Sequence, residues 1–95
     1  MDPPVYGHGP AGESWKLEKD FYLLMKNCRE LLSDQPLFIL LNGYVMGYSA
    51  ISYQNALQSV VDNKKGNMEI GELTIKEEKS ERLLPAGIFV RWSNC

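Results

Sequence analysis

The sequence predicts an α/β fold in which two helices cover a three-stranded mixed sheet. Two segments repeat apolar residues with a helical period, and three other segments have the short apolar patterns of strands. Their order is helix, strand, helix, strand, strand. Strands separated by a helix favour a parallel pair, and the short last connection favours an antiparallel hairpin. At 95 residues, the chain has room for one modest core.

The first 13 residues are expected to be a loop, because their prolines and glycines exclude a helix or a central strand. A helix follows over residues 14–33, with Ser14 as its N-cap. It ends where Asp34-Gln35-Pro36 indicates a turn. Its apolar stripe recurs at helical spacing and consists of Leu17, Phe21, Leu24, Cys28 and Leu31.

The apolar run at residues 37–41 indicates a strand buried on both faces, and Asn42-Gly43 ends it. A second helix is expected over residues 50–62, with Ser49 as its N-cap. Its inner face would consist of Tyr53, Leu57, Val60 and Val61.

Two further strands complete the sheet. In the first, Met68 and Ile70 alternate with polar residues, and Leu73 and Ile75 then alternate in the opposite phase. A β-bulge at Gly71-Glu72 would account for this change of phase. Residues 76–82 are charged and form an exposed connection, and residues 86–92 form the last strand, with Phe89 on the face opposite to Ile88, Val90 and Trp92.

Composition excludes several classes of protein. The net charge of −2 gives no general attraction to nucleic acid, and no apolar run is long enough to span a membrane. Two cysteines, Cys28 and Cys95, make neither a disulfide framework nor a zinc cluster. No metal site is expected, and a reducing cytoplasmic location is the expectation.

Asp2-Pro3-Pro4 is the stretch most informative about chemistry. Two prolines fix the backbone, and the carbonyls before and between them stay free to accept hydrogen bonds. An acidic side chain beside such carbonyls can bind a planar group that offers N–H donors, such as the edge of a nucleobase. A proline-stiffened tail without any site is the alternative.

A longer string carries a family resemblance. Residues 2–17 read DPPVYGHGPAGESWKL, and this string resembles a loop of class I S-adenosylmethionine-dependent methyltransferases, closest to the rRNA methyltransferase-like group. Leu40-Leu41-Asn42-Gly43-Tyr44 and Leu84-Pro85-Ala86-Gly87 also resemble segments of that family, so that the resemblance runs from Asp2 to about Ser93.

The resemblance implies that residues 1–95 are a single partial domain, the C-terminal half of a Rossmann-like methyltransferase fold. Residues 1–13 would be its substrate loop, and residues 14–95 its helix-strand-helix-strand-strand unit. S-adenosylmethionine would be the cofactor of the whole protein, and RNA its partner. The family's glycine-rich cofactor turn has no counterpart, because Gly7-His8-Gly9 neither follows a strand nor opens a helix. We therefore expect the 95 residues alone to be inactive, and their cofactor-binding residues are unknown.

The predicted catalytic residues are Asp2, Pro3 and Pro4, which the resemblance implies, and the predicted substrate-binding residues are Tyr6, Gly7, His8 and Asn42. His8 could be a general base or a solvated side chain, and Asn42 could bind substrate or stabilise the turn. Three tyrosines could stack on a base, but packing explains them more simply: Tyr44, Tyr48 and Tyr53.

Cytosine C5 methylation is not carried over from the family. This reaction needs a thiolate to add to the ring, and the loop after the strand at residues 37–41 contains no cysteine. Cys28 lies on the apolar stripe of the first helix, where a small buried hydrophobic side chain is expected.

Two other functions stay open: a small stand-alone interaction module that has lost the chemistry, and a two-chain enzyme whose other chain binds the cofactor. In the family's sheet the fifth strand lies between the fourth and the antiparallel seventh, with the sixth at the far edge. Residues 37–41 would then have one unpaired edge. A two-fold homodimer that buries this strand or the uncovered sheet face is expected. The alternative is a monomer whose N-terminal loop folds back over the gap.

Overall fold

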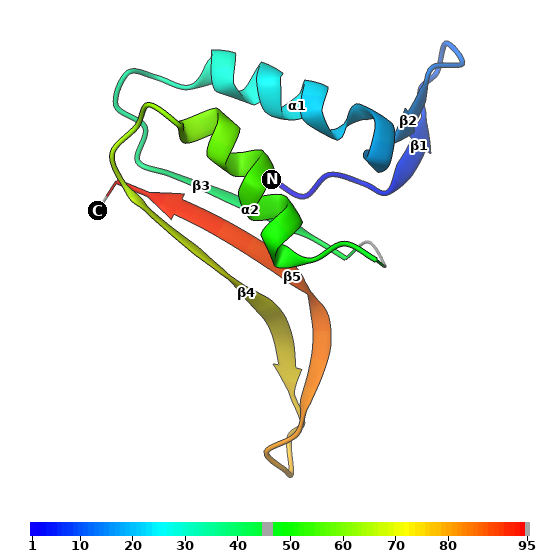
Figure 1. Cartoon of the computed structure of the whole chain (residues 1–95). Helices are drawn as coiled ribbons and strands as arrows, with labels where there is room; N and C mark the ends of the chain where they lie inside the picture. The colour runs from blue at the N-terminus through cyan, green and yellow to red at the C-terminus, as the bar shows by residue number, and fades with distance from the viewer. Residues whose placement is uncertain (45–46, 95) are drawn as a thin grey trace.

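The computed structural model describes residues 1–44 and 47–94, so Cys95 and the loop residues Val45 and Met46 lie outside the described part. Two helices lie on one face of a three-stranded sheet (Figure 1). The predicted α/β fold with two helices and three sheet strands is confirmed, and a small second sheet is added to it. The elements are β1 (Tyr6–His8), β2 (Ser14–Lys16), α1 (Leu17–Leu31), β3 (Phe38–Gly43), α2 (Ala50–Val61), β4 (Asn67–Lys76) and β5 (Leu83–Ser93).

The order of the large sheet is β3–β5–β4, and both pairings are antiparallel. The predicted parallel pair is therefore wrong as a pair of neighbours. β3 and β4 run in the same direction, but β5 lies between them and bonds to both. This order is the one that the family resemblance implies for the fifth, seventh and sixth strands.

β3 buries only one of its faces. Ile39 and Leu41 belong to the core, whereas the side chains of Phe38 and Leu40 are 64% and 40% exposed. The prediction that this strand is buried on both faces is wrong for this chain, because both helices lie on the same side of the sheet (Figure 1). Phe38 and Leu40 thus belong to an uncovered sheet face.

The core lies between the two helices and the covered face of the sheet. All four residues predicted for the inner face of α2 are buried, which confirms that prediction. On α1 the predicted apolar stripe is buried at Leu17 and Phe21, whereas Leu31 is almost fully exposed. Met25, which the predicted stripe did not include, is buried. The buried core residues are Leu17, Phe21, Met25, Ile39, Leu41, Tyr53, Ala56, Leu57, Val60, Val61, Val90 and Trp92.

The N-terminal segment is not purely a loop, because β1 and β2 form a short antiparallel hairpin there. Ser14 lies in β2 and does not cap α1, so that part of the prediction is wrong. The backbone N–H of Leu17 donates to the carbonyl of Val5 at 2.9 Å, and that of Lys16 donates to the Asp20 carboxylate. Pairing with β1 therefore occupies the residues before Leu17 and delays the start of the helix.

The second helix begins where the sequence predicts. The Ser49 hydroxyl accepts the backbone N–H of Ser52, which satisfies one of the free donors at the helix start. α2 ends at Val61, one residue before the predicted end. Near that end Arg29 of α1 forms an ion pair with Asp62 at 3.1 Å and donates to the carbonyl of Ser59, so the two helices are joined there.

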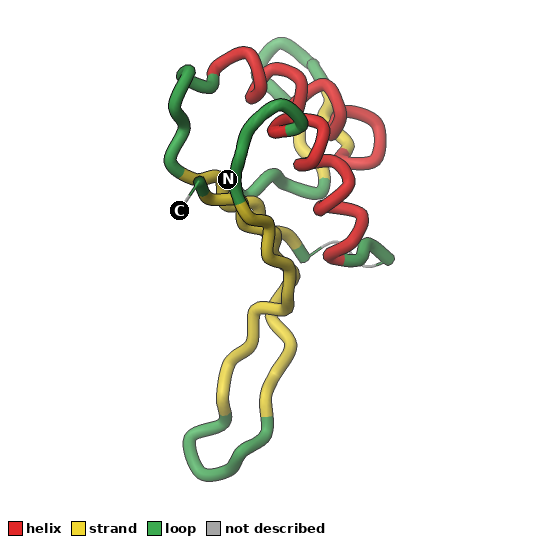
Figure 2. The backbone as a smooth tube through the Cα atoms, turned by 60° about the vertical axis from the view of Figure 1, so that its left-hand side comes forward, coloured by secondary structure: helices red, strands yellow, loops and turns green. Residues whose placement is uncertain are grey.

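β4 and β5 continue as a long hairpin beyond the helices (Figure 2). The predicted bulge at Gly71-Glu72 is wrong, because the ladder is regular there and its register shifts between Leu73 and Thr74. The exposed charged connection predicted for residues 76–82 is confirmed for residues 77–82, whereas Lys76 is the last residue of β4. None of the helices in residues 1–44 and 47–94 is long and apolar enough to span a bilayer.

Candidate functional site

The Asp2-Pro3-Pro4 segment leaves from the outer edge of β3. The carbonyl of Met1 accepts the backbone N–H of Asn42 at 3.1 Å, and the Met1 ammonium group donates to the carbonyl of Leu40. Bonds to alternate residues of one strand are the pattern of parallel pairing. Met1 thus covers part of the free edge of β3 and places Asp2 beside the carboxyl end of that strand.

Asp2 is held by a tyrosine from the loop after β3. The Tyr44 hydroxyl donates to Oδ2 of Asp2 at 2.5 Å. This hydrogen bond, together with partial burial and the carboxylate charge, raises the pKa of the Tyr44 phenol above its ordinary value. The sequence alone explains Tyr44 by packing. Its position directly after Asn42-Gly43 was the only local sign of a role.

The carbonyls of the two prolines have different surroundings. Trp15 donates its indole N–H to the Pro4 carbonyl at 2.7 Å, and Pro3 is buried. No residue within 1–44 and 47–94 donates a hydrogen bond to the carbonyls of Asp2 and Pro3. Among the described residues, these two predicted acceptors therefore have no hydrogen-bond donor.

Tyr6, Gly7 and His8 do not join this cluster. They form β1, and the side chains of Tyr6 and His8 are exposed on the hairpin. No hydrogen bond between described residues links them to Asp2 or Asn42. Of the predicted site residues, the structure brings together Asp2, Pro3, Pro4 and Asn42.

Beneath the cluster lies a buried phenol without a partner. Tyr53 is fully buried, its ring stacks on Phe21 at 5.2 Å between centroids, and its hydroxyl has no hydrogen bond to any described residue. Burial raises the pKa of Tyr53, with further contributions from negative charge on Tyr48 and Asp2. A Cβ atom on Gly43 would lie 2.3 Å from this hydroxyl, so only glycine fits there.

Cys28 is not a fully buried side chain, which corrects the prediction. It is partly exposed and helps to line a depression of about 480 Å³ beside the Asp2-Pro3-Pro4 segment. Its Sγ lies 3.9 Å from Sδ of Met1. The other lining residues, Trp15 and Leu24 among them, make the depression almost wholly apolar.

The described residues do not fit S-adenosylmethionine. Gly7-His8-Gly9 lies in and after β1, and the next element is the antiparallel strand β2 instead of a helix. Gly7-His8-Gly9 is therefore not the glycine turn between a strand and a helix that cradles a nucleotide cofactor. No three His, Cys, Asp or Glu side chains among the described residues could hold a metal ion.

The chain was compared with protein-family models, with curated proteins and with solved structures, and only solved structures match. No protein-family model matches the chain, and no curated protein does. Among solved structures, the chain is similar to the crystal structure of the SAM-dependent methyltransferase from Agrobacterium tumefaciens, with 31% sequence identity and a TM-score of 0.89. The match covers 99% of this chain and 32% of that protein.

The fold of this chain is therefore that of part of a SAM-dependent methyltransferase, and the chain spans about a third of the length of that relative. The likeness includes the segment that carries Asp2, Pro3 and Pro4, because it extends over almost the whole chain. It supports S-adenosylmethionine as the cofactor of proteins with this fold.

Proposed function

We propose that this chain is the C-terminal, substrate-loop part of an S-adenosylmethionine-dependent methyltransferase that acts on RNA, and that it is inactive alone. The likeness to the Agrobacterium tumefaciens methyltransferase over 99% of the chain is the observation that carries the proposal. The lack of a fitting cofactor turn in the described residues supports the inactivity of the isolated chain.

The geometry around Asp2 supports a nucleobase as the substrate group. The Tyr44 hydroxyl occupies one carboxylate oxygen, which leaves the other oxygen and the carbonyls of Asp2 and Pro3 as acceptors. Acceptors on a fixed backbone suit the planar N–H donors on the edge of a base. The backbone N–H of Asn42 donates to the carbonyl of Met1, so Asn42 lies beside the start of the Asp2-Pro3-Pro4 segment. Its side-chain amide is a further polar group at the carboxyl end of β3, where open α/β sheets bind ligands.

In this proposal Asp2, Pro3 and Pro4 hold the base, Tyr44 positions Asp2, and Asn42 contributes a further polar group. S-adenosylmethionine supplies the methyl group when the other part of the methyltransferase binds it. Tyr6, Gly7 and His8 belong to a hairpin that extends from the other end of the loop, so they could contact only the nucleotides that flank the base.

The test joins residues 1–95 to the two-thirds of the Agrobacterium tumefaciens methyltransferase that has no counterpart in this chain. The chimera is given S-adenosylmethionine with a labelled methyl group and RNA, DNA or protein as acceptor. We expect label in RNA. Label in DNA or protein would contradict the RNA part of the proposal, and a chimera that binds the cofactor but labels no acceptor would contradict it as a whole.

Two variants of the chimera test the roles of the residues. Asp2→Ala should lower turnover more than affinity for S-adenosylmethionine, because Asp2 lies on the substrate side. Tyr22→Phe is the control, since this exposed tyrosine of α1 is not among the residues that line the depression beside the loop. Unchanged turnover in Asp2→Ala would remove Asp2 from the site.

A further inference from the structure

The outer half of the β4–β5 hairpin, residues 73–84, extends away from the helices; we call it the arm (Figures 1 and 2). It carries an unusual share of exposed apolar side chains. Four apolar side chains are exposed there: Leu73 at 37%, Ile75 at 59%, Leu83 at 57% and Leu84 at 62%. Single exposed apolar side chains scattered over a surface are ordinary, but a group of them is not.

The strand register places most of these side chains on one face. Ile75 lies directly opposite Leu84, and Leu73 is two residues from Ile75, so the three share a face. The same face continues to Phe89, whose ring lies over Gly71 across the pair of strands. We call Leu73, Ile75, Leu84 and Phe89 the arm stripe.

The arm stripe lies opposite to the helices. Val90, the neighbour of Phe89, is buried in the core on the covered face. The change of phase along β4 thus has a physical meaning: Met68 and Ile70 face the helices, and beyond them the apolar positions move to the other face. The sequence supplies apolar side chains where the described chain has nothing to cover them.

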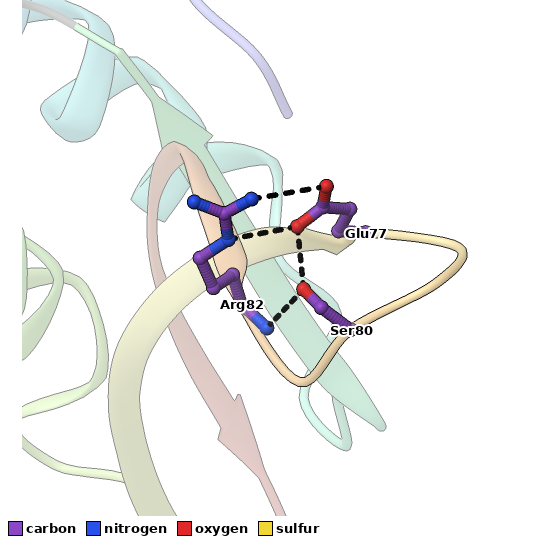
Figure 3. A network of polar contacts seen from close by, with 3 residues as sticks. All are labelled: Glu77, Ser80 and Arg82. Carbon is purple, nitrogen blue, oxygen red and sulfur yellow. Dashed lines mark hydrogen bonds and ion pairs between the residues drawn. The ribbon is translucent and has the colours of Figure 1, made fainter.

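The arm also has a fixed shape at its tip. Arg82 donates to both carboxylate oxygens of Glu77, from Nε at 2.9 Å and from a terminal nitrogen at 3.3 Å, and the Ser80 hydroxyl bonds to the same carboxylate (Figure 3). The backbone N–H of Glu77 donates to the Arg82 carbonyl at 2.9 Å. An element that is ordered before binding loses little conformational entropy when it binds.

The surface area indicates how large the missing contact is. The chain exposes 7001 Å², about 1,500 Å² more than the roughly 5,500 Å² expected for a compact monomer of its mass. Its radius of gyration is 15.2 Å, against about 12 Å for a compact chain of this length. Each partner in a standard interface buries about 800 Å². The surplus is a sum over the whole chain, of which the arm is one part, and it exceeds this area.

Charge favours a second copy as the partner. Between Lys76 and Arg82 the arm has three basic and three acidic side chains, so its net charge is zero and a polyanion such as RNA gains little from it. Beside the arm stripe, Arg91 pairs with Glu69 across neighbouring strands. Two copies related by a two-fold axis can exchange such pairs, with Arg91 of each copy meeting Glu69 of the other.

We propose that the chain forms a two-fold dimer in which the arm stripes of two copies pack face to face. This dimer goes beyond the proposed function and does not require it, although the arm stripe adjoins the candidate site, because Phe89 lies directly opposite Asn42 in the sheet. The sequence predicts a dimer through either the edge of β3 or the uncovered sheet face. The proposed dimer uses the uncovered face of β4 and β5, because Met1 partly covers the edge of β3.

Sedimentation equilibrium of the full 95-residue chain at micromolar concentration tests the dimer. The expected mass is about twice 10.8 kDa. Ile75→Glu and Leu84→Glu should each weaken the dimer roughly ten-fold or more, because each is buried twice at a two-fold interface. Leu23→Glu is the matched control, since Leu23 on α1 is as exposed as Ile75 at 59% and should leave the dimer intact.

Both arm variants change exposed side chains, so their far-UV circular dichroism should match that of the original chain. Hydrogen exchange gives a second measurement: amides of the arm should be protected in the dimer and exchange faster in Ile75→Glu. A monomer across the concentration range would overturn the proposal, and so would a dimer that Leu23→Glu weakens as much as Ile75→Glu. The same holds for an arm that is protected only by added RNA or by the remaining part of the Agrobacterium tumefaciens protein.

Discussion

Replacing Tyr53 with phenylalanine should stabilise the chain, although tyrosine is fully buried in the core. The Tyr53 hydroxyl has no hydrogen bond to a described residue, and a buried polar group without a partner costs about 1–3 kcal/mol. Phenylalanine keeps the ring and its stacking on Phe21. We therefore expect Tyr53→Phe to raise the free energy of unfolding by about 1 kcal/mol, the lower end of that range.

Urea denaturation at one fixed protein concentration measures this change, with Tyr22→Phe as an exposed control that should be neutral. The dependence on pH gives a second readout. Burial raises the pKa of Tyr53, so the native state keeps its proton where the unfolded state loses it. The ionisation of Tyr53 therefore leaves the free energy of unfolding unchanged below about pH 10 and lowers it as the pH rises above that value. Tyr53→Phe should lack this decrease. A variant destabilised by 1 kcal/mol or more would refute the reasoning, because the hydroxyl would then have a partner.

The same contact makes a prediction for Gly43. In Gly43→Ala the new methyl group would lie 2.3 Å from the Tyr53 hydroxyl and 2.8 Å from the ring. Overpacking destabilises by about 1–3 kcal/mol. Replacing glycine also lowers the entropy of the unfolded chain, which stabilises by less than about 1 kcal/mol, so we expect a net destabilisation of about 1–2 kcal/mol. The cost should be smaller in the Tyr53→Phe background, because the closest overlap is with the hydroxyl. Equal costs in both backgrounds would contradict this geometry.

Two further measurements test other parts of the structure. Calorimetric titration of the isolated chain with S-adenosylmethionine should give no dissociation constant below about 100 μM, roughly −5.5 kcal/mol, and tighter binding would mean that the described residues do hold the cofactor. The carboxyl group of Glu77 should titrate below its usual 4.5 because Ser80 and Arg82 bond to the charged form, so the order of the arm tip should persist above that pH and be lost as the pH falls through the lowered pKa. Carbon NMR of Glu77 in the original chain and in Arg82→Gln checks the second prediction, and an equal pKa in both would contradict it.

Local signals in the sequence predicted the elements whose structure depends on local contacts. The helix after Ser49 was found because one side chain caps it and its apolar residues recur with a period of 3.6. The hairpin of β1 and β2 was missed, because the prolines and glycines around it indicated turns without showing which residues would pair. The start of α1 was misplaced for the same reason: residues 14–16 pair with β1, and Ser14 has no bearing on the helix.

The candidate site depends on contacts between distant parts of the chain, so the sequence predicted only some of it. Asp2 and Asn42 were recognised from their own motifs, whereas the Tyr44–Asp2 hydrogen bond joins residues that are 42 positions apart. Which tyrosine would reach the carboxylate depends on the pairing of Met1 with β3, and no local pattern shows that. Tyr6 and His8 were grouped with the site because they belong to the same resembling string as Asp2, but they pair with β2 and do not join the cluster.

The errors at β3 and β4 have a common cause. In both strands the sequence supplies apolar residues for two faces, and the structure covers one face with helices: Phe38 and Leu40 in β3, and Leu73 and Ile75 in β4, lie on the other. A buried-strand pattern states that a face will be covered, but it does not say by which chain. The two uncovered regions differ in their edges, since Met1 pairs with β3 in parallel while the arm has no described neighbour beyond its own two strands. A parallel strand added beside Met1 would extend the sheet at the site, and a second arm would cover the other region, so the proposed enzyme part and the proposed dimer can exist in the same assembly.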